Sequence, residues 1–201
     1  IATGQLASMA SRLFPVSRGL THAYWAPNGW ALYTFADRLA AAIAGRLLPE
    51  ESVTWLLGGG TGTRTGGSSG LVGETAMLLL PSVGAGIAAA LVLLAQSPVL
   101  LRTWQRPSRA AFAPAMVYCA LAAFAFGYHV HEKAILPPLL LLTVLAPPSD
   151  SLAASLHARS LRVLSAAGHY GLLPLMYHPS HWALARIWLM AHFVALRMAI
   201  Q

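Results

Sequence analysis

The residues best suited to chemistry stand together in one short stretch, His129-Val130-His131-Glu132-Lys133. Two imidazoles, a carboxylate and an ammonium lie there between two apolar runs, one ending at Phe126 and the other beginning at Leu136. Lys133 is the only lysine in the chain, and every other fixed positive charge is an arginine. Ionisable groups are costly to place at the edge of such runs, so the cluster is a candidate site.

Three kinds of chemistry fit this cluster. A metal site is the weakest, because His129 and His131 would point about 200° apart on a helix and no third ligand is clearly supplied nearby. The zinc-protease pattern H-E-x-x-H fails, since position 135 is isoleucine. An anion site would use Lys133 with either histidine to neutralise a phosphate, while Glu132 orients the lysine or a sugar hydroxyl. The alternative without a binding function is a structural ion pair of Glu132 with Lys133 or a distant arginine.

A second group of candidates lies near the N-terminus, where two tryptophans and two tyrosines fall within residues 22–33. Such rings are typical of the interfacial belt of a membrane protein. They also stack on sugar faces, and histidine and asparagine can hydrogen-bond sugar hydroxyls. A binding loop here would use His22, Tyr24, Trp25 and Asn28.

The composition indicates a membrane protein made of helices. Hydrophobic residues make up 57% of the 201 residues and charged residues only 9%, whereas soluble domains carry roughly 25% charged residues. The net charge of +7 comes from arginines placed between apolar runs, which cytosolic loops and lipid phosphate explain better than nucleic acid does. The single cysteine, Cys119, excludes an internal disulfide or a cysteine metal site.

The apolar runs predict an all-α polytopic membrane protein. Residues 31–48 have helical spacing and could form a tilted span or a surface helix. The glycine-rich residues 58–70 are predicted to be a linker, because they lack the spacing of a phosphate-binding loop. The predicted spans are residues 75–95, 110–128, 134–147 and 182–200, with a weaker fifth over 161–177. We therefore expect two regions, an interfacial 1–70 and a membrane domain 71–201, and we expect the chain to be part of a longer protein because it begins with isoleucine.

Arginines predict the orientation of these spans. Arg102, Arg106 and Arg109 crowd the connection between the first two spans, so this connection should be cytosolic, and Arg159 and Arg162 should mark a second cytosolic loop. Alternating the spans then places the cluster around Lys133 on the non-cytosolic face, and the aromatic stretch of residues 22–33 joins it there if residues 31–48 do not cross. That convergence favours a binding loop over an interfacial belt for residues 22–30.

Several runs of this sequence resemble one family, the endoplasmic-reticulum dolichyl-phosphate-glucose-dependent α-1,3-glucosyltransferases. The runs are Ser11-Arg12-Leu13-Phe14-Pro15, Arg18-Gly19-Leu20-Thr21-His22-Ala23-Tyr24-Trp25-Ala26-Pro27-Asn28, Trp30-Ala31-Leu32-Tyr33 and Phe126-Gly127-Tyr128-His129-Val130-His131-Glu132-Lys133-Ala134-Ile135-Leu136. Weaker matches are Leu80-Pro81-Ser82-Val83 and Gly168-His169-Tyr170-Gly171-Leu172-Leu173-Pro174-Leu175. The resemblance covers most of the chain except the glycine-rich linker.

The resemblance implies a C-type glycosyltransferase (GT-C) fold in the endoplasmic-reticulum membrane, with a lumenal active site. It implies transfer of glucose from dolichyl phosphate glucose to an oligosaccharide on dolichyl diphosphate, without a cofactor. The run from His22 to Asn28 resembles the family member that adds the second glucose, to Glc1Man9GlcNAc2. The sister enzyme that adds the first glucose is the alternative, because it shares the His-Glu-Lys motif.

For the site, the resemblance places the catalytic carboxylate in a loop upstream of Ile1, so Glu132 is not assigned as the base. We expect Lys133 and His131 to contact the donor phosphate and Glu132 to position Lys133 or the sugar, with His129 in the same donor-phosphate or substrate site. His22, Tyr24, Trp25 and Asn28 would line the sugar or lipid-phosphate pocket. A transporter that uses the same cluster as a proton relay is the non-enzymatic alternative. It is disfavoured because the apolar runs on either side hold no further ionisable residues.

Overall fold

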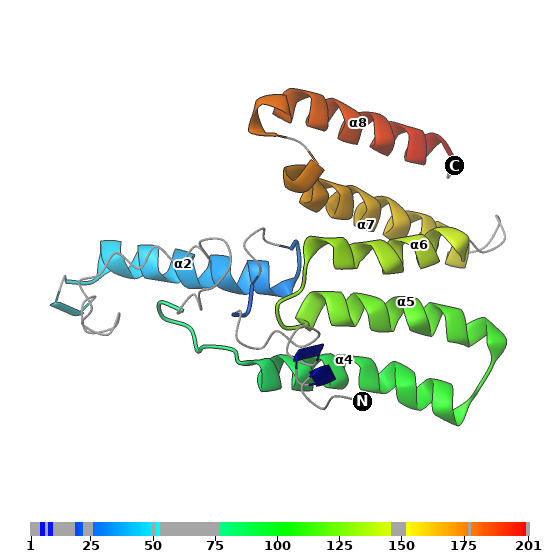
Figure 1. Ribbon diagram of the computed structural model, residues 1–201, viewed down its shortest axis with the longest axis horizontal. Helices are drawn as coiled ribbons and strands as arrows, with labels where there is room; N and C mark the ends of the chain where they lie inside the picture. The colour runs from blue at the N-terminus through cyan, green and yellow to red at the C-terminus, as the bar shows by residue number, and fades with distance from the viewer. Residues whose placement is uncertain are drawn as a thin grey trace. The chain divides into compact units, whose positions relative to one another are not determined.

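The helical prediction is confirmed for the part of the chain that the computed structural model describes, residues 5–6, 8–9, 19–21, 26–49, 51–52, 77–145, 152–176 and 178–199. In these residues the regular structure is helical and no strand is formed (Figure 1). The named elements are α2 (Gly29–Leu47), α4 (Ala85–Gln105), α5 (Arg109–Phe126), the 3-10 helix η1 (Glu132–Ile135), α6 (Leu136–Val144), α7 (Leu152–Met176), the 3-10 helix η2 (Pro179–His181) and α8 (Trp182–Ala199).

The chain folds into two compact units. Unit 1 comprises Ile1–Leu91 with Phe126–Val130, and unit 2 comprises Val92–Ala125 with His131–Gln201. Helix α4 begins in the first unit and ends in the second. The predicted boundary at residue 70 falls outside the described residues and stays a prediction.

Helix α2 is the main element of unit 1, and it fulfils the helix predicted over residues 31–48. Its N-cap is Asn28, whose side-chain oxygen accepts hydrogen bonds from the backbone N–H groups of Trp30 and Ala31. One face is buried through Trp30, Thr34 and Asp37. The indole of Trp30 belongs to an apolar cluster with Leu20, Tyr33, Met77, Val83, Ala88 and Tyr128.

Residues 77–84 do not form the first turns of a membrane span, so the span predicted over 75–95 starts too early. Helix α4 begins only at Ala85 and runs on to Gln105. The backbone N–H groups of Leu78, Leu79 and Leu80 donate to the Asp37 carboxylate instead of to a helix. The carbonyl of Pro81 accepts a 2.8 Å hydrogen bond from the Tyr33 hydroxyl. Side chains of α2 therefore hold this segment in a non-helical form.

In unit 2, α4 and α5 exchange hydrogen bonds across their contact. Gln96 donates through its amide to the carbonyl of Cys119 at 2.9 Å, and the Tyr118 hydroxyl donates to the carbonyl of Ala95 at 3.0 Å. Pro98 lies inside α4 and has no N–H for the carbonyl of Leu94. The Ser97 hydroxyl donates to that carbonyl at 2.9 Å, which satisfies the group that the proline leaves open.

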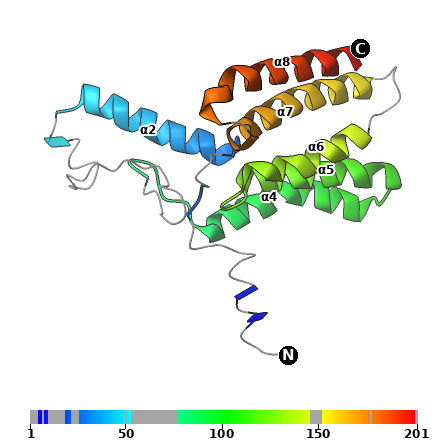
Figure 2. The same cartoon turned by 45° about the horizontal axis from the view of Figure 1, so that its top comes forward.

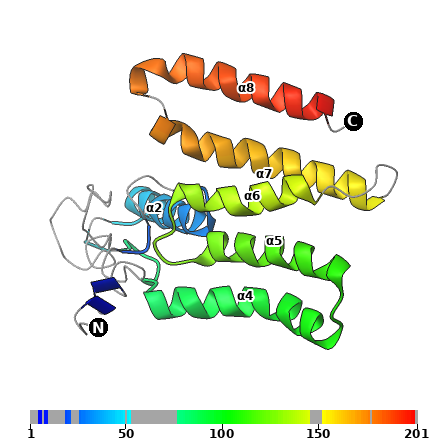
Figure 3. The ribbon, with the colours of Figure 1, turned by 45° about the vertical axis from the view of Figure 1, so that its right-hand side comes forward.

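Helix α7 lies between α6 and α8, as Figures 1 and 3 show from two directions. The predicted loop around Arg159 and Arg162 is wrong, because both arginines lie inside α7. The helix also starts at Leu152, nine residues before the span predicted from residue 161 (161 − 152 = 9). Figure 2 shows α7 and α8 running beside each other over most of their length.

The span predicted over 134–147 is also wrong in the described residues. It is replaced by η1 and by α6, a helix of only nine residues. A nine-residue helix is about 14 Å long, half of what the hydrocarbon core requires. The proline pair at 137–138 fits here, because the first helical amides have no intrahelical acceptor.

Two helices are long and apolar enough to cross a membrane among the described residues, Ala85–Gln105 and Arg109–Phe126. Only 6% and 22% of their apolar windows are buried within the protein, so most of their hydrophobic side chains face outward. A buried core helix of a soluble protein would show the reverse. Helix α8 matches the predicted 182–200 in extent but is not among these two.

Candidate functional site

His129 is held in place by the segment that precedes the aromatic stretch. Its backbone N–H donates to the carbonyl of Leu20 at 2.9 Å, and its ring Nδ1 lies 3.0 Å from the carbonyl oxygen of Gly19. The bond to a carbonyl requires that Nδ1 carries the proton. The side chain is buried, and the backbone is left-handed at both partners, with φ of 53° at His129 and 84° at Gly19. Such backbone in a non-glycine residue persists only where its surroundings fix it.

Two further contacts of unit 1 hold the residues on either side of the aromatic stretch, which we call its stems. Thr21 forms a parallel bridge with Val130 on the N-terminal side. On the C-terminal side, the indole Nε1 of Trp30 donates to the carbonyl of Gly127 at 2.8 Å. Residues 22–25 lie outside the described residues, but the stems on both sides are fixed to the same short segment, 127–130. That segment leads directly into His131, Glu132 and Lys133.

Asn28, a predicted pocket residue, is placed by the structure at the start of α2. Its oxygen Oδ1 accepts from the N–H groups of Trp30 and Ala31 at 3.2 and 3.3 Å. This arrangement explains an asparagine at this position as a helix cap. His22, Tyr24 and Trp25 lie outside the described residues, so their predicted contacts with a sugar stay predictions.

The remaining members of the cluster lie at the start of unit 2. His131 precedes η1, and Glu132 and Lys133 form its first turn. Lys133 and His131 are exposed, whereas Glu132 is only 2% exposed. The motif thus presents the Lys133 ammonium and the His131 imidazole outward and keeps its carboxylate inside. This arrangement suits an anion better than a cation as the exposed ligand.

Helix α7 supports η1 from the inside. Ile135, the last residue of η1, is 3% exposed. A Cβ atom added at Gly168 of α7 would come within 3.1 Å of Ile135 Cγ1 and 2.9 Å of Leu139 Cδ1. Glycine at position 168 therefore permits the side chains of Ile135 and Leu139 to pack closely against the backbone of α7. The 3-10 turn that carries Lys133 rests on a tightly packed helix.

Asp37 is a buried acid of α2 that lies next to Arg38 in the sequence, and the structure gives it backbone partners. Its two carboxylate oxygens accept three backbone N–H bonds, each 2.8 Å long, from residues 78–80. Burial raises the pKa of Asp37, but these three donors and the nearby Arg38 outweigh it, so the pKa falls below its ordinary 3.8. A carboxylate held this way is a poor base, and we regard Asp37 as structural. In the sequence, the only sign of this structural role is that Asp37 is the single acid in the apolar helix α2.

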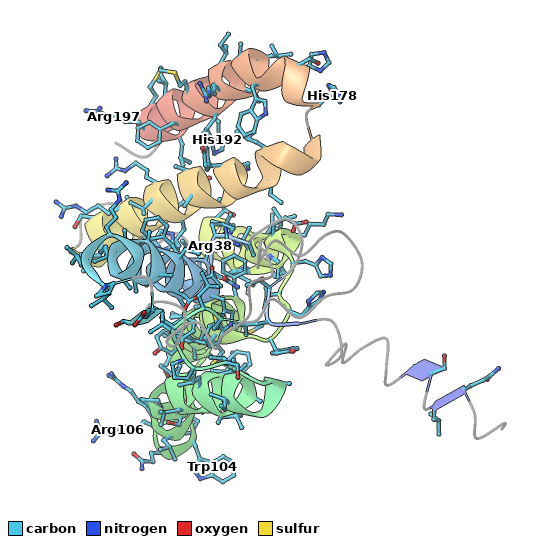
Figure 4. All side chains as sticks on the ribbon, turned by 90° about the vertical axis from the view of Figure 1, so that its left-hand side faces the viewer. Arg38, Trp104, Arg106, His178, His192 and Arg197 are labelled. Atoms are coloured by element: carbon cyan, nitrogen blue, oxygen red, sulfur yellow. The ribbon has the colours of Figure 1, made fainter. Side chains whose placement is uncertain are left out.

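A second polar group missed by the sequence analysis joins α7 to α8. Ser165 Oγ lies 2.8 Å from Nε2 of His192 and 3.3 Å from Nδ1 of His169. The two imidazole rings are 4.3 Å apart, and His169 Nδ1 also lies 2.7 Å from the backbone oxygen of Ser165. Figure 4 shows His192 on the side of α8 that faces α7. The spacing of Ser165 and His169 on one helix face was the only hint in the sequence.

No group of three histidine, cysteine or acidic side chains that could hold a metal ion occurs within the described ranges. The histidine pairs that do form, His169 with His192 and His178 with His181, bring two rings together without a third ligand. Of the residues predicted around Lys133, His129 is buried and bound to Gly19, whereas His131 and Lys133 are exposed.

Comparison with known proteins places this arrangement in a family. The model of the ALG6, ALG8 glycosyltransferase family matches residues 1–201. The chain belongs to the ALG6, ALG8 glycosyltransferase family.

Similar members of the family carry one name, dolichyl pyrophosphate Glc1Man9GlcNAc2 α-1,3-glucosyltransferase. The protein so named in Chaetomium globosum is 37% identical over 98% of this chain and 39% of its own length. The Coccidioides immitis protein is 42% identical over 87% of this chain and 32% of its own length. The mouse protein is 38% identical over 88% and 32%. The chain thus spans about a third of the length of these relatives. No solved structure matches it.

Proposed function

We propose that the protein transfers glucose from dolichyl phosphate glucose to Glc1Man9GlcNAc2 on dolichyl diphosphate, forming an α-1,3 linkage. The observation that carries this proposal is the similarity of nearly the whole chain to proteins named for that acceptor. The donor brings its own leaving group, dolichyl phosphate, so the proposal requires no further cofactor. Both substrates are lipid-linked, which agrees with the outward-facing apolar side chains of α4 and α5.

The reaction needs two kinds of group. A base removes the proton from the acceptor hydroxyl as its oxygen forms the new bond to the glucose C1. As the bond from C1 to the phosphate oxygen breaks, negative charge grows on dolichyl phosphate and must be stabilised. Asp37 is unsuited to the first role, and we propose a carboxylate outside this chain for it.

Lys133 and His131 are the groups that we propose for the departing phosphate. Both are exposed on one short turn, and Lys133 brings the only ammonium of the chain. The buried Glu132 is proposed to hold the position of this turn. His129 takes a different part from the one expected, because its ring Nδ1 faces Gly19. We propose that it positions the segment that precedes Lys133.

The aromatic stretch is proposed to bind the glucose or the lipid phosphate. Its two stems are tied to residues 127–130 within unit 1. His22, Tyr24 and Trp25 would supply stacking surfaces and hydrogen bonds, with Asn28 at the end of the stretch.

We further propose that the protein is a multi-pass enzyme of the endoplasmic-reticulum membrane with a GT-C fold and a lumenal active site. The support is its family, the two helices of spanning length and the arginines at the connection of α4 to α5. Positive residues in short loops favour the cytosolic side, which leaves the turn of Lys133 on the other side.

The test is glucose transfer by the full-length enzyme in microsomes that lack the endogenous activity. Labelled dolichyl phosphate glucose is the donor, and Glc1Man9GlcNAc2 or Man9GlcNAc2 on dolichyl diphosphate is the acceptor. We expect label only on the first acceptor. Label on Man9GlcNAc2 would instead identify the enzyme that adds the first glucose, and transfer to neither would refute the proposal.

Lys133→Gln tests the proposed site in the same assay. We expect its turnover to fall at least about 100-fold, as when a preorganised donor to a developing charge is removed. Arg186→Gln removes an exposed positive charge from α8 and should keep turnover near the wild-type value. A Lys133→Gln enzyme with wild-type turnover would remove Lys133 from the mechanism.

A further inference from the structure

The connection between α4 and α5 concentrates positive charge at one end of two helices. Arg102 lies in the last turn of α4, Arg106 follows the helix and Arg109 begins α5. All three are exposed. Figure 4 shows Arg106 and Trp104 extending outward from the same end of α4.

This charge has no acidic counterpart nearby in the sequence. Residues 75–131 contain neither aspartate nor glutamate. In unit 2, the acidic residues are Glu132, which follows the opposite end of α5, and Asp150, which lies outside the described residues. Within the described part of unit 2, no nearby acidic side chain offsets the positive field at this connection, which therefore attracts anions.

The surface here combines a shallow hollow with large apolar side chains. The hollow has a volume of about 430 Å³ and is lined by Thr103, Pro107, Ser108, Arg109 and Phe112. Phe112 is 58% exposed, and Trp104, the neighbour of Thr103, is 86% exposed. Guanidinium groups and exposed aromatic rings in one short segment suit the boundary between lipid headgroups and acyl chains.

The lengths of the helices place this connection at such a boundary. Helix α4 has 21 residues and is about 32 Å long, which matches a hydrocarbon core of about 30 Å. Helix α5 begins only four residues after α4 ends (109 − 105 = 4) and is the second helix of spanning length. If both cross the bilayer, the connection between them lies at headgroup level.

We propose that the connection of α4 to α5 is a binding site for the phosphate headgroup of an anionic phospholipid. Arg102, Arg106 and Arg109 bind the headgroup, Trp104 and Phe112 contact the adjoining acyl chains, and Ser108 borders the hollow. The proposal concerns a different surface from the glucose-transfer site and does not depend on the identity of the sugar acceptor. Charge complementarity favours a lipid phosphate because the same surface is both basic and apolar.

The experiment is lipid titration of the full-length protein in neutral detergent, followed by native mass spectrometry. The probes are phosphatidylserine, phosphatidylcholine and inorganic phosphate. We expect phosphatidylserine to bind in preference to the other two. The variant R102Q/R106Q/R109Q should bind phosphatidylserine on the order of 100-fold more weakly, at about fivefold for each charge lost. Its binding of phosphatidylcholine should stay unchanged.

Two variants serve as controls. R46Q/R186Q/R197Q removes the same charge from other helices and should keep the preference for phosphatidylserine. R102K/R106K/R109K retains the charge and should stay within about tenfold of the wild type. If the glutamine variant does not fold, the three single substitutions replace it, each with its fivefold loss. Equal binding of both lipids, inorganic phosphate binding as tightly as phosphatidylserine, or an equal loss in R46Q/R186Q/R197Q would overturn the proposal.

Discussion

Two histidines of one motif can differ completely in burial. His129 and His131 are two positions apart, yet the first is buried against Gly19 and the second is exposed. The reason is local backbone geometry, because φ of 53° at His129 turns its side chain toward the stem of the aromatic stretch. Residue type alone made both histidines candidates for a phosphate contact.

Asp37→Asn should destabilise the enzyme by about 2–4 kcal/mol. Asparagine offers one acceptor oxygen, and its NH₂ group would face a backbone N–H of residues 78–80, leaving buried donors unsatisfied. The change in unfolding free energy can be measured by thermal or denaturant unfolding at pH 7. Glu51→Gln, which removes an exposed carboxylate, should leave the stability unchanged.

The contribution of Asp37 to the free energy of unfolding should depend on pH. Because folding lowers the pKa of Asp37, its stabilisation is complete above the ordinary aspartate pKa of about 4. The stabilisation is lost as pH falls through the lowered value. The wild type and Asp37→Asn should therefore differ at pH 7 and converge in acid. A constant difference down to pH 2 would contradict this assignment.

Helix packing fixes the turn of Lys133 through α7. A methyl group at Gly168 would push on Ile135 and Leu139, so Gly168→Ala should cost about 1 kcal/mol and reduce glucose transfer. Gly45→Ala in α2 is the matched control, because nothing lies within 4 Å of its added Cβ. That change should stabilise the protein by up to about 1 kcal/mol. Melting temperature and turnover of the two variants provide the comparison, and a neutral Gly168→Ala would show that the contact relaxes freely.

Apolar periodicity predicted most helices but not their exact starts. Residues 31–48, 110–128 and 182–200 gave α2, α5 and α8 within two residues. The start of α4 was missed because Asp37 binds residues 78–80 across more than 40 positions of sequence, which no local pattern records. The first turns of α7 were missed because Arg159 and Arg162 resemble loop charges. The length of α6 was overestimated because an apolar run does not show where a helix ends.

The predicted site is only partly accounted for by the sequence. Lys133 and His131 are exposed, but their predicted contact with a phosphate stays a prediction. The tethering of His129 depends on a hydrogen bond between residues 110 positions apart and on left-handed backbone. The polar contact of Ser165 with His192 depends on how α7 meets α8. Both are long-range features, so residue spacing could not reveal them.

The orientation of the entire chain can be tested by labelling. In a background without other cysteines, Arg106→Cys should react with a membrane-impermeant maleimide in sealed microsomes, because it is exposed at the proposed cytosolic connection. Lys133→Cys should react only after the membrane is opened. Equal labelling of both positions in sealed microsomes would contradict the proposed topology. Lys133→Arg should stay unlabelled in either state.

The two tied stems also bear on how related enzymes can diverge. The described bonds that fix them join residues 19–21 and Trp30 to residues 127–130. A chimera that exchanges only residues 22–25 leaves the partners of these bonds unchanged. If the aromatic stretch binds the sugar as proposed, its recognition could change without rebuilding the segment that anchors it.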